Sequence, residues 1–242
     1  MKLIKSKNYE EMCAKVARIF AAQITLKPDS VLGLATGSTP IGMYQELVRK
    51  YNEDRVDFGK VRTVNLDEYI GLSGDNDQSY RYFMNHNLFD HVDIDKSQTF
   101  VPNGLAADPE AECVNYENIV DSMGGVDIQL LGIGNNGHIG FNEPLTPFTS
   151  MTHIVKLTDS TREANKRFFA SIDDVPTHAV TMGIHTVMQA KSIILMAFGE
   201  GKAEIIKKTV EGRPEIAVPA SLLQLHEDVE LYLDEAAASK LS

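Results

Sequence analysis

The sequence predicts an α/β fold, namely a single-domain, mainly parallel, Rossmann-like open sheet with helices on both faces. Short apolar runs typical of buried parallel strands alternate with amphipathic segments of helical period. The chain has 242 residues and no internal repeat or linker, which favours one domain over residues 1–242. The clearest strand signals are Val31–Ala35, Val61–Leu66, Val126–Leu131 and Ser192–Phe198.

The first helix is predicted over residues 8–27. Asn8 and Glu11 match a capping box, apolar residues follow at helical spacing, and Pro28 marks the end. We expect this helix to serve as scaffold. Further helices are expected from Thr39 as N-cap, over Ser79–Phe89, over Pro109–Met123, from Thr158 and from Lys202, with final strands over Pro219–Leu225 and Val229–Leu233.

Composition excludes several classes of partner. The net charge is −11, with 34 acidic and 23 basic residues, which argues against nucleic acid and anionic membranes but leaves a local site for a small anion possible. Two distant cysteines, Cys13 and Cys113, form neither a disulfide framework nor a metal cluster. We therefore expect a cytoplasmic protein without a metal site, and no signal peptide or membrane-spanning run is evident.

The turn after the first apolar strand has the chemistry of an anion site. Gly37, Ser38 and Thr39 lie between the strand and Pro40, which suits the first position of a helix. Free N–H groups and the positive end of the helix dipole would then face the turn. An ordinary tight turn is an equally good interpretation, and the absence of a Walker lysine excludes a nucleotide P-loop.

Asp67 follows the second predicted strand. Ligands of open α/β sheets gather at the carboxyl ends of the strands, so this carboxylate is well placed to take part in chemistry. The alternative is a helix cap or a solvated turn residue.

A glycine-rich stretch, residues 132–144, follows the third strand. Gly132, Gly134 and Gly137 satisfy the G-x-G-x-x-G pattern of dinucleotide-binding folds. We reject that interpretation because Pro144 and Pro147 leave little room for the required helix. The motif is also not on the first strand-to-helix turn, and its own histidine suggests chemistry.

His138 and Glu143 lie within this stretch and are expected to pair. A carboxylate that contacts one imidazole nitrogen orients the ring, and the other nitrogen can then move a proton. A loop histidine that only caps backbone groups is the alternative. Arg162 and Lys202 are cations at predicted helix starts, where they oppose the helix dipole unless an anion lies nearby. Together they could clamp a phosphate, although each alone could be a surface charge.

Three blocks of this sequence resemble the glucosamine-6-phosphate deaminase family. They are the turn at 37–40, Asn65-Leu66-Asp67-Glu68-Tyr69, and the His-Ile-Gly-Phe-Asn-Glu-Pro run within 134–144, and the likeness extends over nearly the whole chain. The resemblance implies a single deaminase-like domain that isomerises an aldose to a ketose and releases ammonia. Glucosamine 6-phosphate and water would give fructose 6-phosphate and ammonium in the catabolism of N-acetylglucosamine, with no metal or organic cofactor.

The resemblance also implies residue roles. Asp67 would take the C2 proton and return it at C1, and His138 would open the sugar ring with support from Glu143 and Asn136. Larger members of the family carry Asp at the position of Asn136, so we expect Asn136 to orient the His138–Glu143 pair.

The substrate phosphate, by the same resemblance, would lie on Gly37, Ser38 and Thr39 and be held by Arg162 and Lys202. His153 and Val155 replace basic residues that bind an activator in larger members, so little allosteric activation by N-acetylglucosamine 6-phosphate is expected. The sequence leaves open whether the chain is a monomer or a homo-oligomer.

Two other functions compete with this one. A hydrolase similar to 6-phosphogluconolactonase would share the glycine-rich loop, but its reaction would not require Asp67 to remove a proton from C2. A non-catalytic sugar-phosphate sensor would be expected to carry a DNA-binding region. We find no basic helix-turn-helix motif in this sequence and no spare length for one.

Overall fold

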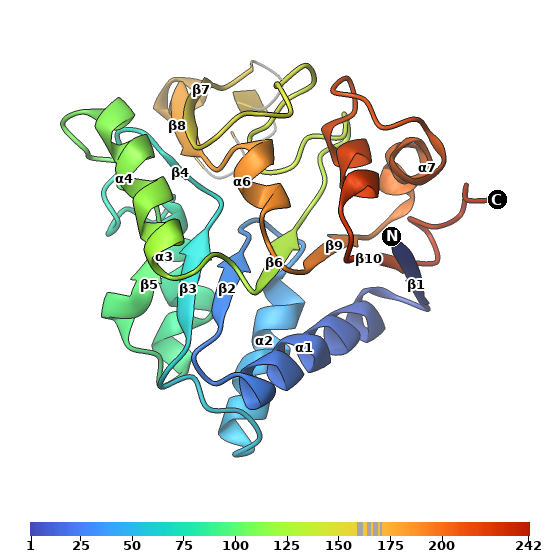
Figure 1. Cartoon of the computed structure of the whole chain (residues 1–242), viewed down its shortest axis with the longest axis horizontal. Helices are drawn as coiled ribbons and strands as arrows, with labels where there is room; N and C mark the ends of the chain where they lie inside the picture. The colour runs from blue at the N-terminus through green and yellow to red at the C-terminus, as the bar shows by residue number, and fades with distance from the viewer. Residues whose placement is uncertain (159–161, 164–165, 167–168, 170) are drawn as a thin grey trace.

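A seven-stranded parallel sheet forms the centre of the computed structural model, which describes residues 1–158, 162–163, 166, 169 and 171–242. Each of the four clearest apolar runs in the sequence contains one of its strands, and the mainly parallel α/β class is confirmed (Figure 1). In spatial order the strands are β1 (Lys2–Ser6), β10 (Val229–Asp234), β9 (Ile193–Ala197), β6 (Ile128–Leu131), β2 (Val31–Leu34), β3 (Arg62–Asn65) and β5 (Thr99–Phe100).

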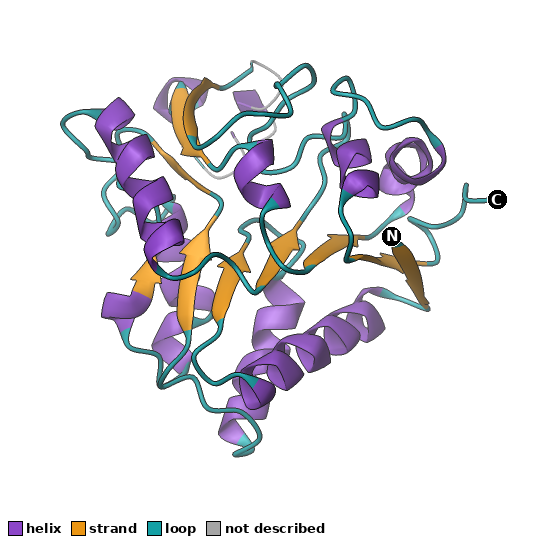
Figure 2. Ribbon diagram, viewed as in Figure 1, coloured by secondary structure: helices purple, strands orange, loops and turns teal. Residues whose placement is uncertain are grey.

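Helices cover both faces of this sheet, as Figure 2 shows. The chain moves from β1 through β2 and β3 to β5 in one direction, and then returns through β6, β9 and β10 in the other. Because parallel crossovers are right-handed, the reversal puts the later helices on the opposite face. One face carries α1 (Tyr9–Leu26), α2 (Ile41–Asn52) and α3 (Tyr80–Asn87), and the other α4 (Pro109–Ser122), α6 (Ile184–Met188) and α7 (Ala203–Glu211).

The strand order reverses between β2 and β6, which are neighbours in the sheet. At such a switch point the two following loops leave toward opposite faces and open a crevice at the carboxyl ends of the strands. The turn at 36–40 follows β2 and the glycine-rich stretch follows β6, so the fold brings these two predicted site segments to the same crevice.

A small antiparallel sheet, which the sequence did not predict, lies beside the crevice. It consists of β4 (Asp67–Tyr69), β8 (His178–Thr181) and β7 (His153–Lys156) in the order β4-β8-β7. Asp67 pairs with Thr181 in this sheet. The predicted second strand is therefore two strands, since β3 ends at Asn65 and the chain then joins the second sheet at Asp67.

The main hydrophobic core fills both faces of the large sheet, and a smaller cluster lies under the second sheet around Tyr69, Phe141, Leu157 and Ala179. Short 3-10 helices complete the described elements: η1 (Phe89–His91), η2 (Lys96–Gln98), η4 (Ile172–Asp174), η5 (Glu200–Lys202) and η6 (Pro219–Leu225). Among the helices that are described, none combines the length and the apolar character needed to span a bilayer.

Three expectations from the sequence need comment. Residues 219–225 form η6 and are not a strand: Pro219 occupies a first helical position, and the run packs against the glycine-rich stretch through Ala220 N–H and Gly137 O. Thr39 is not the N-cap of α2, because the helix begins at Ile41 with Pro40 as its cap residue. The helix expected from Thr158 falls largely outside the described residues.

Candidate active site

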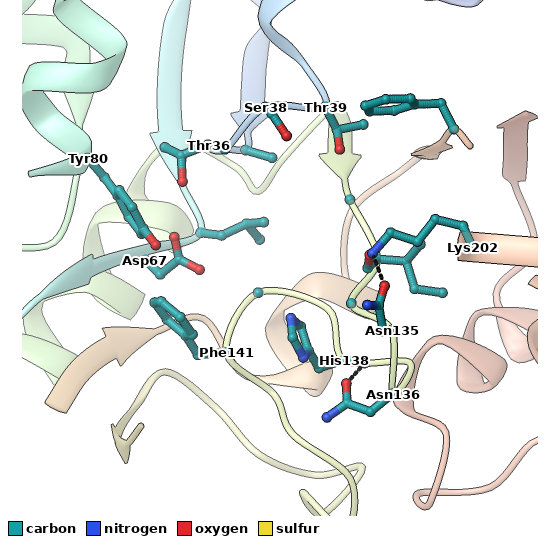
Figure 3. A pocket seen from close by; sticks show the side chains of 18 residues that line it. Thr36, Ser38, Thr39, Asp67, Tyr80, Asn135, Asn136, His138, Phe141 and Lys202 are labelled. Carbon is teal, nitrogen blue, oxygen red and sulfur yellow. Dashed lines mark hydrogen bonds between the residues drawn. The ribbon is translucent and has the colours of Figure 1, made fainter. Parts of the chain in front are cut away.

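A cavity of about 750 Å³ opens at the carboxyl ends of β2, β3, β6 and β9, at the switch point of the sheet. Figure 3 shows that side chains from all four strand ends point into it. Seven of the nine predicted site residues line it, and Glu143 and Arg162 do not. The lining residues are Ala35, Thr36, Gly37, Ser38, Thr39, Leu66, Asp67, Tyr80, Gly132, Ile133, Gly134, Asn135, Asn136, His138, Gly140, Phe141, Phe198 and Lys202.

Asp67 is the carboxylate on the wall of this cavity. It is 6% exposed, and burial, followed by the negative charge of Glu68, raises its pKa to about 8. A carboxyl group whose charged form is disfavoured in this way holds a proton more tightly than an ordinary Asp does. Asp67 can therefore accept a proton from a weak carbon acid and give it back near neutral pH.

Glu68 is fixed behind Asp67 by three backbone donors. Its carboxylate accepts the N–H groups of Tyr69, Tyr80 and Arg81, each at 2.9 Å. These contacts join β4 to the first turn of α3, where a negative charge is favoured by the helix dipole. The side chain thus does not reach the cavity but sets both the position and the electrostatic surroundings of Asp67.

Tyr80 lines the cavity next to Asp67 and was not identified from the sequence. Its hydroxyl end points toward the Asp67 carboxylate (Figure 3), and its ring stacks on Phe141 with centroids 6.1 Å apart and planes 14° apart. Burial holds the pKa of Tyr80 well above its usual range, so the phenol stays a hydrogen-bond donor. In the sequence Tyr80 is one of several aromatic residues at helical spacing, and no local signal separates it from a core residue.

His138 faces Asp67 across the cavity. The predicted partner Glu143 is nearby, but the distance from His138 Nδ1 to Glu143 Oε2 is 3.6 Å, which is longer than a hydrogen bond. Asn136 links the two residues: its amide donates to Glu143 Oε2 at 2.6 Å, and its Oδ1 accepts the His138 N–H at 3.2 Å. Asn136 thus connects the backbone of His138 to the Glu143 carboxylate, and its role in orienting the imidazole stays a prediction.

The His138 imidazole lies directly against Gly134. A Cβ built on Gly134 would overlap three atoms of the ring, so only glycine leaves the imidazole where it is. The glycine-rich stretch also turns through left-handed backbone at Gly137, with φ +89°. These glycines shape the loop around a histidine, whereas a dinucleotide motif would shape it around a pyrophosphate.

The turn after β2 offers backbone donors to the other end of the cavity. Within the described chain, the N–H groups of Gly37, Ser38 and Thr39 have no acceptor at hydrogen-bond distance. Gly37 has φ +88°, which L side chains rarely adopt and which lets successive amides converge. Ser38 and Thr39 also direct their hydroxyls into the cavity near the start of α2 (Figure 3).

Lys202 supplies the positive charge at this end. Its Nζ donates to Ile133 O and to Asn135 Oδ1, both at 2.7 Å, which leaves the third donor of the ammonium for a ligand. The described residues provide no carboxylate within ion-pair distance of Nζ. Desolvation lowers the pKa of Lys202, as expected for a half-buried cation that lacks a counter-ion.

Arg162 does not line the cavity with Lys202, so the predicted clamp of two cations is not present in this structure. The guanidinium Nη2 instead donates to the backbone carbonyls of Ile172, at 2.7 Å, and Val175, at 3.1 Å. Two backbone carbonyls at the ends of the short helix η4 thus occupy Nη2 of the cation that the sequence assigned to an anion. Among the described residues, no cluster of three His, Cys, Asp or Glu side chains could hold a metal ion.

A buried carboxylate faces an imidazole across a cavity whose far end presents free amides and an ammonium group. This arrangement defines an acid–base enzyme for a small anionic substrate. The chain belongs to the family of glucosamine-6-phosphate isomerases/6-phosphogluconolactonase, whose model matches residues 5–232.

Known proteins place it more closely within that family. The chain is 57% identical over 241 residues to the glucosamine-6-phosphate deaminase of Clostridium perfringens, covering 100% of both chains. It is 56% identical to that of Clostridioides difficile, covering 100% of this chain and 97% of the other. A solved structure described as a monomeric glucosamine-6-phosphate deaminase matches with a TM-score of 0.97 and 52% identity, over 99% of this chain and 100% of that one. A 6-phosphogluconolactonase from Trypanosoma brucei is 19% identical with a TM-score of 0.78, over 100% and 98% of the two chains, and shares the fold alone.

Proposed function

We propose that this cavity converts glucosamine 6-phosphate and water into fructose 6-phosphate and ammonium. The single observation that carries the proposal is Asp67: a buried carboxyl group with a pKa of about 8, facing His138 over a cavity with an anion-binding end. An isomerase needs such a base for a carbon-bound proton, whereas lactone hydrolysis removes no proton from C2. The deaminase names of the relatives at 57% and 56% identity support the same reaction.

Binding begins at the phosphate. Its oxygens accept hydrogen bonds from the Lys202 ammonium and from the N–H groups of residues 37–39. The sugar then extends along the cavity toward Asp67 and His138. The phosphate does not take part in the chemistry. Its binding energy fixes the distance and orientation of the reacting carbons, which is how a remote group contributes to catalysis.

Ring opening is the task of His138. The cyclic sugar opens when a proton leaves the C1 hydroxyl and another reaches the ring oxygen, and a neutral imidazole can carry out this transfer. Asn136 fixes the loop backbone at His138 relative to the Glu143 carboxylate, whose Oε2 lies 3.6 Å from His138 Nδ1. The product of this step is the open aldehyde with an amine at C2.

Isomerisation and deamination follow at Asp67. With the C2 amine protonated, the carboxylate removes the C2 proton to give an enolamine and then returns a proton to C1. The aldehyde oxygen gains the proton that the nitrogen loses, which leaves an alcohol at C1 and an iminium group at C2. Water adds to C2 and the C–N bond breaks, so that ammonium leaves and the ketone of fructose 6-phosphate remains. Tyr80 lies beside the carboxylate and can donate a hydrogen bond to the substrate oxygen on which negative charge develops.

The proposal is tested by incubating the purified protein with glucosamine 6-phosphate and measuring ammonium and fructose 6-phosphate in equal amounts. A parallel reaction with 6-phosphogluconolactone measures acid release, which the lactonase alternative requires. Absence of ammonium from the first reaction would reject the proposal, and acid release from the second alone would favour the lactonase.

The pH dependence of kcat/KM should follow the free Asp67 carboxyl. The base must be deprotonated, and its pKa is raised to about 8, so kcat/KM is expected to rise about tenfold per pH unit up to about pH 8 and then level off. Glu68→Gln removes a negative charge next to Asp67 and should move the rising part of the pH profile to lower pH. The shift would show that this part of the profile reports the titration of Asp67 and not that of the substrate amine. A limb that remains near pH 8 in that variant would contradict the assignment.

Three further properties complete the proposal: the oligomeric state, the cellular compartment and the metabolic direction. We infer a monomer in the cytoplasm that degrades N-acetylglucosamine-derived sugar. The monomer is supported by the relative at 52% identity that is described as monomeric, and the cytoplasm by two buried cysteines that form no disulfide.

A further inference from the structure

Tyr9 supports the turn at 37–40 from the side opposite the cavity. It is the first residue of α1 and does not line the cavity. Its single O–H proton lies between two acceptors, Thr39 O at 3.1 Å and Ser38 O at 3.3 Å, and the hydroxyl oxygen accepts the Gly42 N–H at 2.9 Å. One side chain thus bonds three successive parts of the strand-to-helix connection.

These contacts set the direction of the amides. In a trans peptide the C=O and the following N–H point in opposite directions. Because Ser38 C=O points at Tyr9, the Thr39 N–H of the same peptide points away from Tyr9, toward the cavity that Ser38 and Thr39 line. Gly42 N–H, by contrast, is occupied by the Tyr9 hydroxyl and is withdrawn from any ligand.

The ring of Tyr9 reaches the other half of the anion-binding end. It packs against Phe198, with centroids 4.7 Å apart, and Phe198 lines the cavity just before the loop that carries Lys202. Gly42 makes this arrangement possible, since a Cβ there would lie 2.9 Å from Tyr9 Cε1 and from Cys13 Sγ. Burial raises the pKa of Tyr9 to about 12, so the hydroxyl remains a donor throughout the working pH range.

We infer that Tyr9 is a positioning residue for the phosphate end of the cavity. It fixes the position of the Ser38–Thr39 amides relative to the Phe198–Lys202 segment. This inference deepens the proposed function and rests on it for the identity of the substrate. The role of Tyr9 in binding requires only that the ligand carries a phosphate group. The sequence had assigned the helix that begins at Tyr9 to the scaffold alone.

The test replaces Tyr9 by Phe, which keeps the ring against Phe198 and removes only the hydroxyl. Loss of a neutral hydrogen bond typically weakens an interaction about 3- to 10-fold. We expect the Kd for inorganic phosphate, measured by calorimetry, and the KM for glucosamine 6-phosphate to rise by about this factor. The kcat is expected to stay within about twofold of wild type, because the hydroxyl does not touch the reacting atoms.

Two variants calibrate the result. Lys202→Gln removes the cation and should weaken phosphate binding about 10-fold or more. Tyr232→Phe removes a hydroxyl that bonds Glu230 on β10, away from the cavity, and should leave the phosphate Kd unchanged. A wild-type phosphate Kd in Tyr9→Phe, or a lower kcat with unchanged KM, would overturn the inference. Failure of the wild type to release ammonium would instead reject the proposed reaction, and the phosphate measurement would still decide the role of Tyr9.

Discussion

Replacing Asp67 by Asn is expected to lower the kcat for ammonium release by about 10²- to 10⁴-fold, the usual contribution of a general base. The amide has nearly the same shape but cannot accept the C2 proton. Phosphate binding should be retained, because Asp67 lies at the end of the cavity away from Gly37–Thr39 and Lys202 (Figure 3). Steady-state kinetics with an ammonium assay, together with the phosphate Kd, measure both effects. An active Asp67→Asn variant would contradict the role of this carboxyl.

The stability of the same variant shows whether a loss of activity reflects unfolding. Folding raises the pKa of Asp67 from about 4 to about 8, so the folded state binds this proton more tightly than the unfolded state. That contribution is fully present below about pH 4 and is lost as the pH rises toward 8. Asn carries no such penalty, so urea unfolding should show Asp67→Asn to be more stable than wild type at pH 8, with the difference shrinking at pH 5. A destabilised variant at pH 8 would contradict the shifted carboxyl.

Gly134→Ala is expected to lower kcat by about 10²-fold, although it alters no group that takes part in the reaction. The new methyl group would overlap the imidazole of His138, so the ring must move from its place against the loop. A displacement of about 1 Å of a catalytic group is enough for a loss of this size. The measurement is kcat with glucosamine 6-phosphate.

Gly201→Ala provides a matched control for this substitution. Gly201 lies in η5, after the cavity end of β9, but a Cβ there would have nothing within 4 Å, and its φ is not in the left-handed region. Its kcat should equal that of wild type. Equal activity of Gly134→Ala and Gly201→Ala would show that the position of His138 is not limiting.

The parts of the site that the sequence predicted lie where strands end. Asp67, His138 and the turn at 37–39 each follow an apolar run, and parallel strands bring their carboxyl ends to one edge. Lys202 lines the cavity, and the sequence singled it out because a cation at a helix start is unfavourable without an anion. Site residues whose position follows from the order of strands and helices, or from local charge, can thus be predicted from the sequence.

Residues that owe their place to tertiary packing were missed or misplaced. Tyr80 and Tyr9 begin helices and look like core aromatics, and only the second sheet and the packing of α1 on α2 bring them to the site (Figure 1). Arg162 obeyed the same charge argument as Lys202 but is satisfied by the carbonyls of Ile172 and Val175. Periodicity also could not separate η6 from a strand, since both present short apolar runs.

The most direct test of the central claim follows the proton that Asp67 carries. Wild-type protein is incubated with glucosamine 6-phosphate deuterated at C2, and the fructose 6-phosphate is examined by NMR for deuterium at C1. One carboxyl that is only 6% exposed should return part of the label before it exchanges with water, so a measurable fraction of the product is expected to carry deuterium at C1. Product that contains only protium at C1, with the label wholly in the solvent, would contradict transfer by a single shielded Asp67.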